Sequence, residues 1–280
     1  MNYTSLSCKL LCASAASSTI TNSDRSGRYN PCENSNPQYD AVGYINNPYI
    51  VVADQIEAAL IGRTETEVIV SFRGKLTPAA NWDSVFDWLQ DFFAFPVENP
   101  NLPGKVHSGY LLALTLLADD IREAIRDLDP TGSLPLYFTG HSKGGGIAPI
   151  AAMYFQNTLG LKVTQTITFA GPNPGDAEFA KAYNTTFPND LRYENYLDLV
   201  PLLPPTPESI TDIEAIPNLP ADFISSLNDA KKWDYNPVGT LQYINPKGVI
   251  KEYANWEASL LFPVRIGEII DVLSTSRLPS

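Results

Sequence analysis

The sequence predicts an α/β protein, with a mostly parallel central sheet flanked by helices, and three observations support this prediction. Apolar, β-branched runs typical of strands occupy residues 67–72, 136–139, 163–169 and 191–196. A helical apolar pattern fills residues 109–127, between the first two of these runs. The run at 136–139 leads into a glycine-rich turn that opens a second helix. Strands that alternate with helices in this way are typical of a parallel sheet.

The length and composition fit one globular domain over residues 1–280. The chain has 280 residues, is 44% hydrophobic and shows no shift in composition that would mark a linker. We expect an N-terminal arm at 1–40 and a proline-rich, irregular insertion at 201–235. The helix after the glycine-rich turn should kink at Pro149, and a last helix should cover residues 263–273.

The charge and hydropathy of the chain limit its partners. A net charge of −12 and a sequence pI of 4.6 argue against nucleic acid or an anionic membrane surface as partner. We therefore expect a neutral or apolar substrate and a monomeric protein. No apolar run approaches the roughly 20 residues of a membrane span, and the first residues lack the basic flank and apolar core of a signal peptide.

All three cysteines, Cys8, Cys12 and Cys32, lie near the N-terminus. None has the His or Cys neighbours of a zinc site, so we expect no metal and no cofactor. Their clustering suggests one disulfide that attaches the arm to the body, with three possible pairings. Three reduced thiols are the alternative.

The turn Gly140-His141-Ser142-Lys143-Gly144 is the most informative motif of the chain. Glycines two before and two after the serine let a strand and a helix approach closely, which holds the serine hydroxyl up at a sharp turn. The pattern indicates a nucleophile elbow, and the alternative is a glycine-rich turn with an ordinary serine.

A serine nucleophile needs a base, since its hydroxyl is almost wholly protonated near neutral pH. The chain has two histidines, His107 and His141, and neither follows Ser142. The side chain of His141 leaves the backbone in a different direction from that of Ser142, so we expect it to support the elbow by packing.

Five segments follow one another along the chain: VSFRGK at 70–75, VHSGY at 106–110, TGHSKGG at 139–145, TFAGPNPG at 168–175 and DLVPLLP at 198–204. Together and in this order they resemble the class 3 lipases, the fungal-type triacylglycerol lipases with the α/β-hydrolase fold. The resemblance implies that Ser142 is the nucleophile and Asp198 the triad acid. It places the backbone N–H groups of Lys75 and Lys143 in the oxyanion hole, and it makes His107 structural.

Two of these assignments have a weak point. Lys75 stands where the family usually has Ser or Thr, which matters little because the required group is the backbone N–H. Asp198 follows a strand end, where a turn or helix-capping carboxylate is the alternative.

Residues 76–95 lie where the family carries its lid. Trp82, Val85, Phe86, Leu89, Phe92 and Phe93 form one apolar face at helical spacing. We expect lid or substrate contacts from Trp82, Phe86, Trp88 and Phe92, and the alternative is a helix that faces the core. A lid of this kind covers the serine in water and opens on a lipid surface.

The leading prediction is a serine hydrolase of apolar acyl esters, a triacylglycerol lipase or a carboxylesterase, that acts on lipid or small ester substrates at a lipid–water interface and is secreted. A feruloyl esterase or phospholipase on the same fold, and a non-catalytic protein without the triad histidine, are the alternatives.

In the family the catalytic histidine lies near the C-terminus, after the acid. We therefore expect that the 280 residues end just before that histidine. Because each residue spans at most ~3.5 Å, Ser280 should lie within about 15 Å of Ser142 and Asp198.

Overall fold

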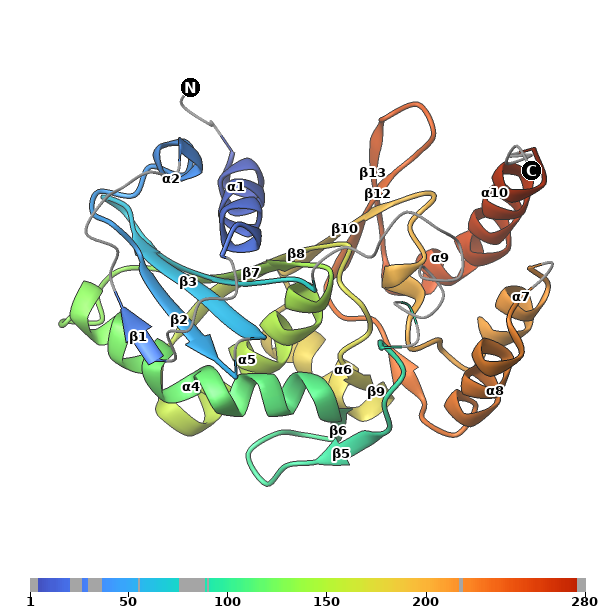
Figure 1. The fold of residues 1–280 in the computed structure, drawn as a ribbon, viewed down its shortest axis with the longest axis horizontal. Helices are drawn as coiled ribbons and strands as arrows, with labels where there is room; N and C mark the ends of the chain where they lie inside the picture. The colour runs from blue at the N-terminus through green and yellow to red at the C-terminus, as the bar shows by residue number, and fades with distance from the viewer. Residues whose placement is uncertain are drawn as a thin grey trace.

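A computed structural model of the chain describes residues 5–20, 27–29, 37–54, 56–75, 89, 91–216 and 219–275. Its larger sheet has nine strands in the order β1-β2-β3-β4-β7-β8-β10-β12-β13. The five strands from β4 to β12 in this order are parallel, and antiparallel strands extend both edges (Figure 1). The strands are β1 Gly27–Tyr29, β2 Tyr49–Ala53, β3 Glu57–Arg63, β4 Val68–Phe72, β7 Leu136–His141, β8 Val163–Phe169, β10 Leu191–Asn195, β12 Thr240–Ile244 and β13 Ile250–Tyr253.

A second, four-stranded sheet has the order β11-β9-β6-β5. Its short strands are β5 Pro96–Glu98, β6 Lys105–His107, β9 Gly175–Asp176 and β11 Tyr235–Asn236. This sheet joins segments that are far apart in the sequence, since β9 pairs with both β6 and β11.

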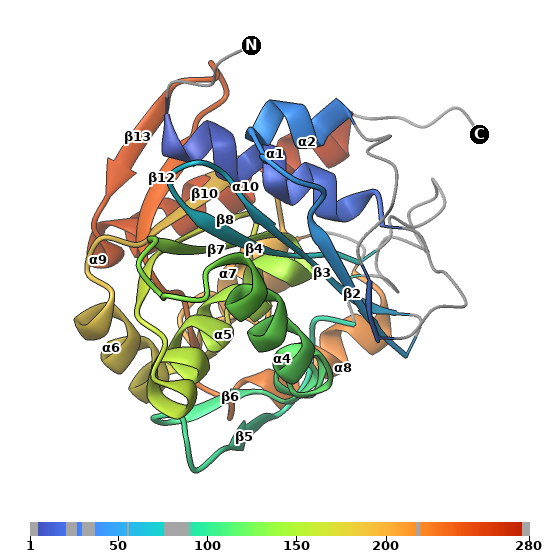
Figure 2. The ribbon, with the colours of Figure 1, turned by 90° about the vertical axis from the view of Figure 1, so that its left-hand side faces the viewer.

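Helices cover both faces of the large sheet (Figures 1 and 2). On one face lie α1 (Leu6–Ser18) and α2 (Pro37–Val42), and on the other α4 (Ser108–Leu128), α5 (Lys143–Leu159) and α6 (Ala177–Thr186). The chain after β10 adds η1 Val200–Leu202, α7 Ile210–Glu214, α8 Ala221–Ala230, α9 Asn255–Ala258, η2 Ser259–Leu261 and α10 Phe262–Thr275. Among the described helices, none has both the length and the apolar character needed to cross a bilayer.

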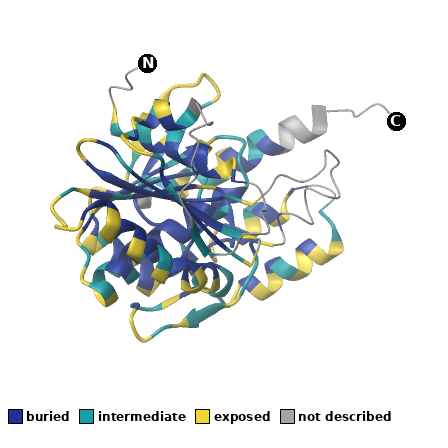
Figure 3. Cartoon of the chain, turned by 60° about the vertical axis from the view of Figure 1, so that its left-hand side comes forward, coloured by how far each residue is buried: buried dark blue, intermediate teal, exposed yellow. Residues whose placement is uncertain are grey.

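The sheet separates two hydrophobic clusters because successive side chains of a strand point to opposite faces. In β3, Ala59 and Ile61 belong to the cluster under α4 and α5, whereas Ala58 and Leu60 belong to the cluster under α1. Inner strands such as β3 and β4 are therefore buried on both sides, whereas the edge strand β13 is exposed at three of its four residues. Most other exposed residues lie on the outer helix faces and loops (Figure 3).

The sequence-based prediction of an α/β fold is confirmed. The predicted runs at 67–72, 136–139, 163–169 and 191–196 are the parallel strands β4, β7, β8 and β10, the helix at 109–127 is α4, and the last helix is α10. The elbow helix α5 continues past Pro149 and ends at Gly160, whose φ of 65° closes it in the left-handed conformation.

The prediction of an irregular segment at 201–235 is wrong in part. This segment contains most of η1, together with α7, α8 and the first residue of β11. Two of its prolines lie at helix starts, since Pro201 is within the first turn of η1 and Pro220 is the N-cap of α8. Pro204, Pro205 and Pro207 lie in the non-helical stretch between η1 and α7, where the prediction holds.

The N-terminal arm contains a helix that the sequence pattern did not indicate. Helix α1 packs on the sheet through the fully buried Leu10, Ala13 and Ala16 and through buried hydroxyl groups. The Ser14 and Thr139 hydroxyls lie 2.9 Å apart, and the Ser71 hydroxyl donates to Ser17 at 3.0 Å. Cys8 and Cys12 are free thiols, so the predicted disulfide is not found among the described residues, and Cys32 lies outside them.

A buried carboxyl connects α6 to the sheet. Asp190 accepts hydrogen bonds from the Tyr183 hydroxyl at 2.5 Å and from the Thr166 N–H at 2.9 Å. Burial raises the pKa of Asp190 to about 6. The folded chain thus holds the Asp190 proton over a pH range in which the unfolded chain, with an aspartate pKa near ~3.9, has released it.

We expect the free energy of unfolding to fall as pH rises from 4 to 6.5, because the folded state binds more protons there. A pKa difference of about 2 units corresponds to about 3 kcal/mol. Asp190→Asn keeps an acceptor for the Thr166 N–H but has no carboxyl to titrate, so it should lose this pH dependence of the free energy of unfolding. All other groups titrate alike in the wild type and the variant. Urea unfolding of both proteins across this range measures the difference. Parallel pH profiles would contradict the assignment.

Candidate active site

Ser142 lies at the sharp turn between β7 and α5. Its backbone angles, φ 55° and ψ −130°, are rarely adopted by a residue with a side chain. A Cβ built on Gly140 would lie 2.3 Å from the Gly144 carbonyl carbon, and one on Gly144 would lie 2.1 Å from the Phe72 carbonyl oxygen. Both glycines are therefore required, because backbone occupies the space that a side chain would take.

Hydrogen bonds fix the backbone of Ser142, whereas its hydroxyl has no partner among the described residues. The Ser142 N–H donates to the Phe169 carbonyl at 3.0 Å, and the Ser142 carbonyl accepts from the Gly145 N–H at 2.7 Å. Ser142 is 4% exposed, and its Oγ has no hydrogen-bond partner within the described part of the chain. A buried hydroxyl without a partner is costly, which makes this serine a candidate for chemistry.

The loop after β4 passes directly beside Ser142. A Cβ built on Gly74 would lie 3.4 Å from the Ser142 Cβ and 2.8 Å from the His141 carbonyl oxygen. The buried Arg73 anchors this loop, since its guanidinium donates to the Ile20 carbonyl at 2.6 Å and also to the Ile56 carbonyl.

The two predicted oxyanion residues lie on the two segments that meet at Ser142. Lys75 follows Gly74 in the loop, and Lys143 is the first residue of α5. The first N–H groups of a helix have no acceptor inside it, and they lie at the positive end of its dipole. The Lys143 N–H is therefore available to a ligand beside Ser142.

A cavity of about 470 Å³ lies against these segments. Its wall combines apolar and aromatic residues, two glycines and five charged residues. The uncharged ones are Ile56, Gly74, Phe92, His107, Gly109, Tyr110 and Leu112, and the charged ones are Glu57, Arg73, Lys75, Asp91 and Lys143.

The lysine side chains at this cavity are paired, Lys143 with Glu57 and Lys75 with Asp91. Burial, followed by the charge of Lys143, lowers the pKa of Lys75.

His107 forms part of the cavity wall and is engaged at both ring nitrogens. It is 1% exposed and stacks on Tyr110, with ring centroids 3.6 Å apart and planes 7° apart. Nδ1 accepts from the Tyr110 N–H at 3.3 Å, and Nε2 lies 3.1 Å from the Phe92 carbonyl oxygen. Burial lowers the pKa of His107 to about 4. The ring is therefore neutral near pH 7, and this arrangement agrees with a structural role.

Asp198 lies in the turn after β10, at the same edge of the sheet as Ser142. Strands β7 and β10 are parallel and flank β8, so their carboxyl ends point the same way. Asp198 Oδ1 accepts from the Val200 N–H at 3.0 Å. Burial raises the pKa of Asp198 to about 6, against the opposing effects of the Val200 N–H and of the charge on Arg265.

Most of the predicted lid lies outside the described residues, including Trp82, Phe86 and Trp88. Phe92 is 2% exposed within the main hydrophobic core and also lines the cavity. The lid and the substrate contacts of these four residues stay predictions.

Sequence reasoning missed three charged residues of the site. Glu57 and Asp91 hold the side chains of the two lysines, and Arg265 of α10 donates to the Asp198 carbonyl at 3.2 Å. Glu57 and Arg265 lie far along the chain from their partners. For those two residues, no local pattern signals the contact.

A nucleophile elbow at the carboxyl edge of a parallel sheet covered by helices defines the α/β-hydrolase fold. The family model for lipase (class 3) matches residues 69–208, which is half of the chain. The chain belongs to the class 3 lipase family.

Known proteins agree with this placement. The lipase of Rhizomucor miehei is 30% identical over 151 residues, which cover 51% of this chain and 39% of that protein. The chloroplastic phospholipase A(1) DAD1 of Arabidopsis thaliana is 29% identical over 182 residues, or 58% of this chain and 38% of that protein. The chain thus spans less than half the length of these two relatives.

The crystal structure of an MDLA mutant from Penicillium cyclopium has the same fold. It superposes with a TM-score of 0.61 at 18% identity and covers 90% of this chain and 86% of that one.

Replacing an elbow glycine should be far more damaging than replacing a glycine elsewhere. Gly140→Ala places a methyl group on backbone atoms that cannot move away, so we expect a loss of about 3 kcal/mol or more. Gly267→Ala in α10 is the control, because a Cβ there meets no described atom within 4 Å. It should be neutral or stabilise by up to ~1 kcal/mol. Thermal unfolding followed by circular dichroism compares them, and equal effects would contradict the geometry.

Proposed function

We propose that this chain is a serine ester hydrolase for apolar acyl esters, a triacylglycerol lipase or carboxylesterase. The observation that carries the proposal is the state of Ser142. Its hydroxyl is unpartnered among the described residues and is held in a strained turn between the Lys75 loop and the start of α5. A nucleophile with two backbone N–H donors beside it is what acyl transfer requires.

The mechanism follows from these positions. Ser142 Oγ attacks the ester carbonyl while its proton passes to a histidine base that Asp198 orients. The carbonyl oxygen becomes an oxyanion and accepts hydrogen bonds from the Lys75 and Lys143 N–H groups, each worth about 3 kcal/mol. The base then protonates the leaving alcohol, and water releases the acyl group from Ser142.

Neither histidine of this sequence is placed to act as the base for Ser142. His107 has both ring nitrogens engaged with backbone groups, and His141 is exposed at the end of β7. The predicted position of Ser280, within about 15 Å of Ser142 and Asp198, falls on residues 276–280, which lie outside the described residues.

A phospholipase is the second candidate. It is supported by the name of the Arabidopsis relative and by the charges that line the cavity, where three cations stand against the two carboxylates Glu57 and Asp91 and leave one positive charge for an anionic phosphate. The feruloyl esterase and the non-catalytic protein remain alternatives. We also propose that the protein is a monomer that acts outside the cytoplasm, at a lipid–water interface.

Imidazole in solution tests the proposal on the chain as it exists. If Ser142 is an assembled nucleophile that lacks only its base, added imidazole should raise the hydrolysis of p-nitrophenyl butyrate well above the rate of imidazole alone. Ser142→Ala should return the rate to that of imidazole alone and abolish labelling by an organophosphonate. Ser108→Ala is the matched control and should behave as wild type. Labelling that persists in Ser142→Ala would overturn the assignment of the nucleophile.

The substrate class is tested with the same chain, in the presence of imidazole, on dispersed lipids. We expect release of fatty acid from mono- and triacylglycerols because the cavity wall near Ser142 includes Ile56, Phe92 and Leu112. Fatty-acid release is measured by pH-stat titration, with Ser142→Ala as the blank. Faster release from phosphatidylcholine than from acylglycerols would favour the phospholipase, and release from neither would favour the non-catalytic protein.

A further inference from the structure

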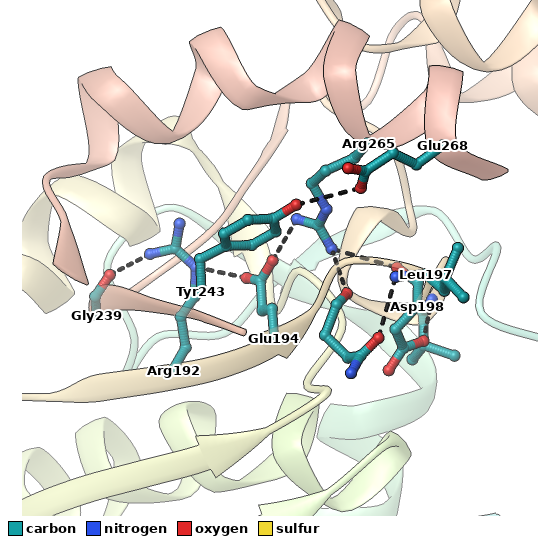
Figure 4. A network of polar contacts seen from close by, with 10 residues as sticks. Arg192, Glu194, Leu197, Asp198, Gly239, Tyr243, Arg265 and Glu268 are labelled. Atoms are coloured by element: carbon teal, nitrogen blue, oxygen red, sulfur yellow. Dashed lines mark hydrogen bonds and ion pairs between the residues drawn. The ribbon is translucent and has the colours of Figure 1, made fainter. Parts of the chain in front are cut away.

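A network of buried charges lies beside the turn that carries Asp198 (Figure 4). The Glu194 carboxylate of β10 accepts from Arg192 Nε at 2.7 Å and from Arg265 Nη1 at 2.5 Å. The three side chains are 6%, 4% and 3% exposed for Arg192, Glu194 and Arg265. Such charges are tolerated away from water only when they are paired and hydrogen-bonded.

Arg265 extends this network to the backbone of the Asp198 turn. Its Nη2 donates to the Asp198 carbonyl at 3.2 Å and lies 3.5 Å from the Asn195 carbonyl oxygen. The turn is closed by the Asp198 N–H, which donates to the Asn195 carbonyl at 3.1 Å. Arg265 therefore holds both ends of the turn from a helix that begins more than 60 residues later.

The charges near the Asp198 carboxyl act on it in opposite senses. The guanidinium groups of Arg192 and Arg265 meet the Glu194 carboxylate. Glu268 of α10 belongs to the same network and accepts from the Tyr243 hydroxyl, whose ring lies under Arg265 (Figure 4). Burial and the charge of Glu194 raise the pKa of Asp198, whereas the Val200 N–H and the charge of Arg265 lower it. Among these groups, Arg265 is the cation.

We propose that Arg265 is a positioning residue for the reaction, which fixes the turn that carries Asp198 and supplies the charge that keeps its carboxylate ionised. The inference rests on the proposed function, in which Asp198 orients a histidine. An acid in this role must be ionised, because it stabilises the imidazolium that forms when the base accepts a proton. Arg265 lies outside the part of the chain that matches the family model.

The competing explanation is purely structural, with Arg265 serving only to attach α10 to β10. The two explanations differ in the Asp198 carboxyl, which a structural role would leave unchanged. The decisive readout is therefore the pKa of Asp198, measured by NMR on the full chain with ¹³C-labelled aspartate and assigned with Asp198→Asn.

Arg265→Met should raise the pKa of Asp198 by about 1 unit or more, the usual effect of losing a nearby opposite charge. Arg192→Met is the matched control. It also removes one partner of Glu194, but the charged groups that act on the Asp198 carboxyl are Arg265 and Glu194, so the effect of Arg192 on Asp198 should be smaller. An unchanged pKa in Arg265→Met, or equal shifts in both variants, would overturn the inference.

Arg265→Lys separates charge from geometry, because a single ammonium replaces the planar fork of N–H donors. It should keep the pKa of Asp198 near the wild-type value and still lower the imidazole-dependent hydrolysis of p-nitrophenyl butyrate by Ser142. If Arg265→Met does not fold, the double variant Glu194→Gln with Arg265→Met removes both buried partners and is compared with Glu194→Gln alone, because the charge of Glu194 itself raises the pKa of Asp198. The double variant should have the higher Asp198 pKa of the two, and equal values would overturn the inference.

These outcomes are distinguishable from failure of the proposed function, since the NMR titration needs no reaction at Ser142. An inert Ser142 in the wild-type chain would overturn the ester hydrolase, whatever the pKa of Asp198. A reactive Ser142 with an Asp198 pKa that ignores Arg265 would overturn this inference alone.

Discussion

The site depends on one close approach of backbone to backbone. Helix α5 begins against the end of β4, where the Cα of Gly144 faces the Phe72 carbonyl with no room for a methyl group. This contact brings the N-terminus of α5 next to the loop at residues 73–75, and with it both N–H groups assigned to the oxyanion hole. The strained angles of Ser142 persist because the surrounding backbone leaves no other conformation.

The elements around the strained turn at Ser142 are held in place by many buried contacts. Most residues of α5 from Gly144 to Phe155 are buried, and the loop beside the elbow is held by Arg73 across to Ile20 and Ile56. Helix α1 adds hydroxyl contacts to β4 and β7 from the opposite face. A strained turn needs such support, since a looser frame would let Ser142 relax into an ordinary turn.

Local motifs predicted the parts of the fold that are encoded locally. Strand β4 was visible as a continuous apolar run because all of its residues are buried, whereas β10 has buried residues only at alternate positions. The elbow was visible because its glycines are needed for steric reasons. Helix α1 was missed because its buried face combines Leu10, Ala13 and Ala16 with serines, which in a sequence read as polar loop residues. Helix α8 was missed because Pro220 at its start resembles a proline in a loop.

The parts of the site that sequence could not predict are those made by distant partners. Glu57 beside Lys143, and Arg265 beside the Asp198 turn, meet only after the sheet has formed. Family resemblance placed Ser142 and Asp198 but gave no information on α10, since the match ends at residue 208. Long-range ion pairs have no sequence period, so only the structure reveals them.

Two buried aspartates show how environment separates structure from function. Burial raises the pKa of Asp190 and of Asp198 alike, to about 6. The groups that face Asp190 are neutral, the Tyr183 hydroxyl and the Thr166 N–H, which suit a carboxyl that joins two elements. Asp198 instead lies near the guanidinium of Arg265, whose charge lowers its pKa. A carboxyl at the edge of the sheet that is desolvated, yet faced by a cation, is suited to stay ionised when a protonated base forms next to it.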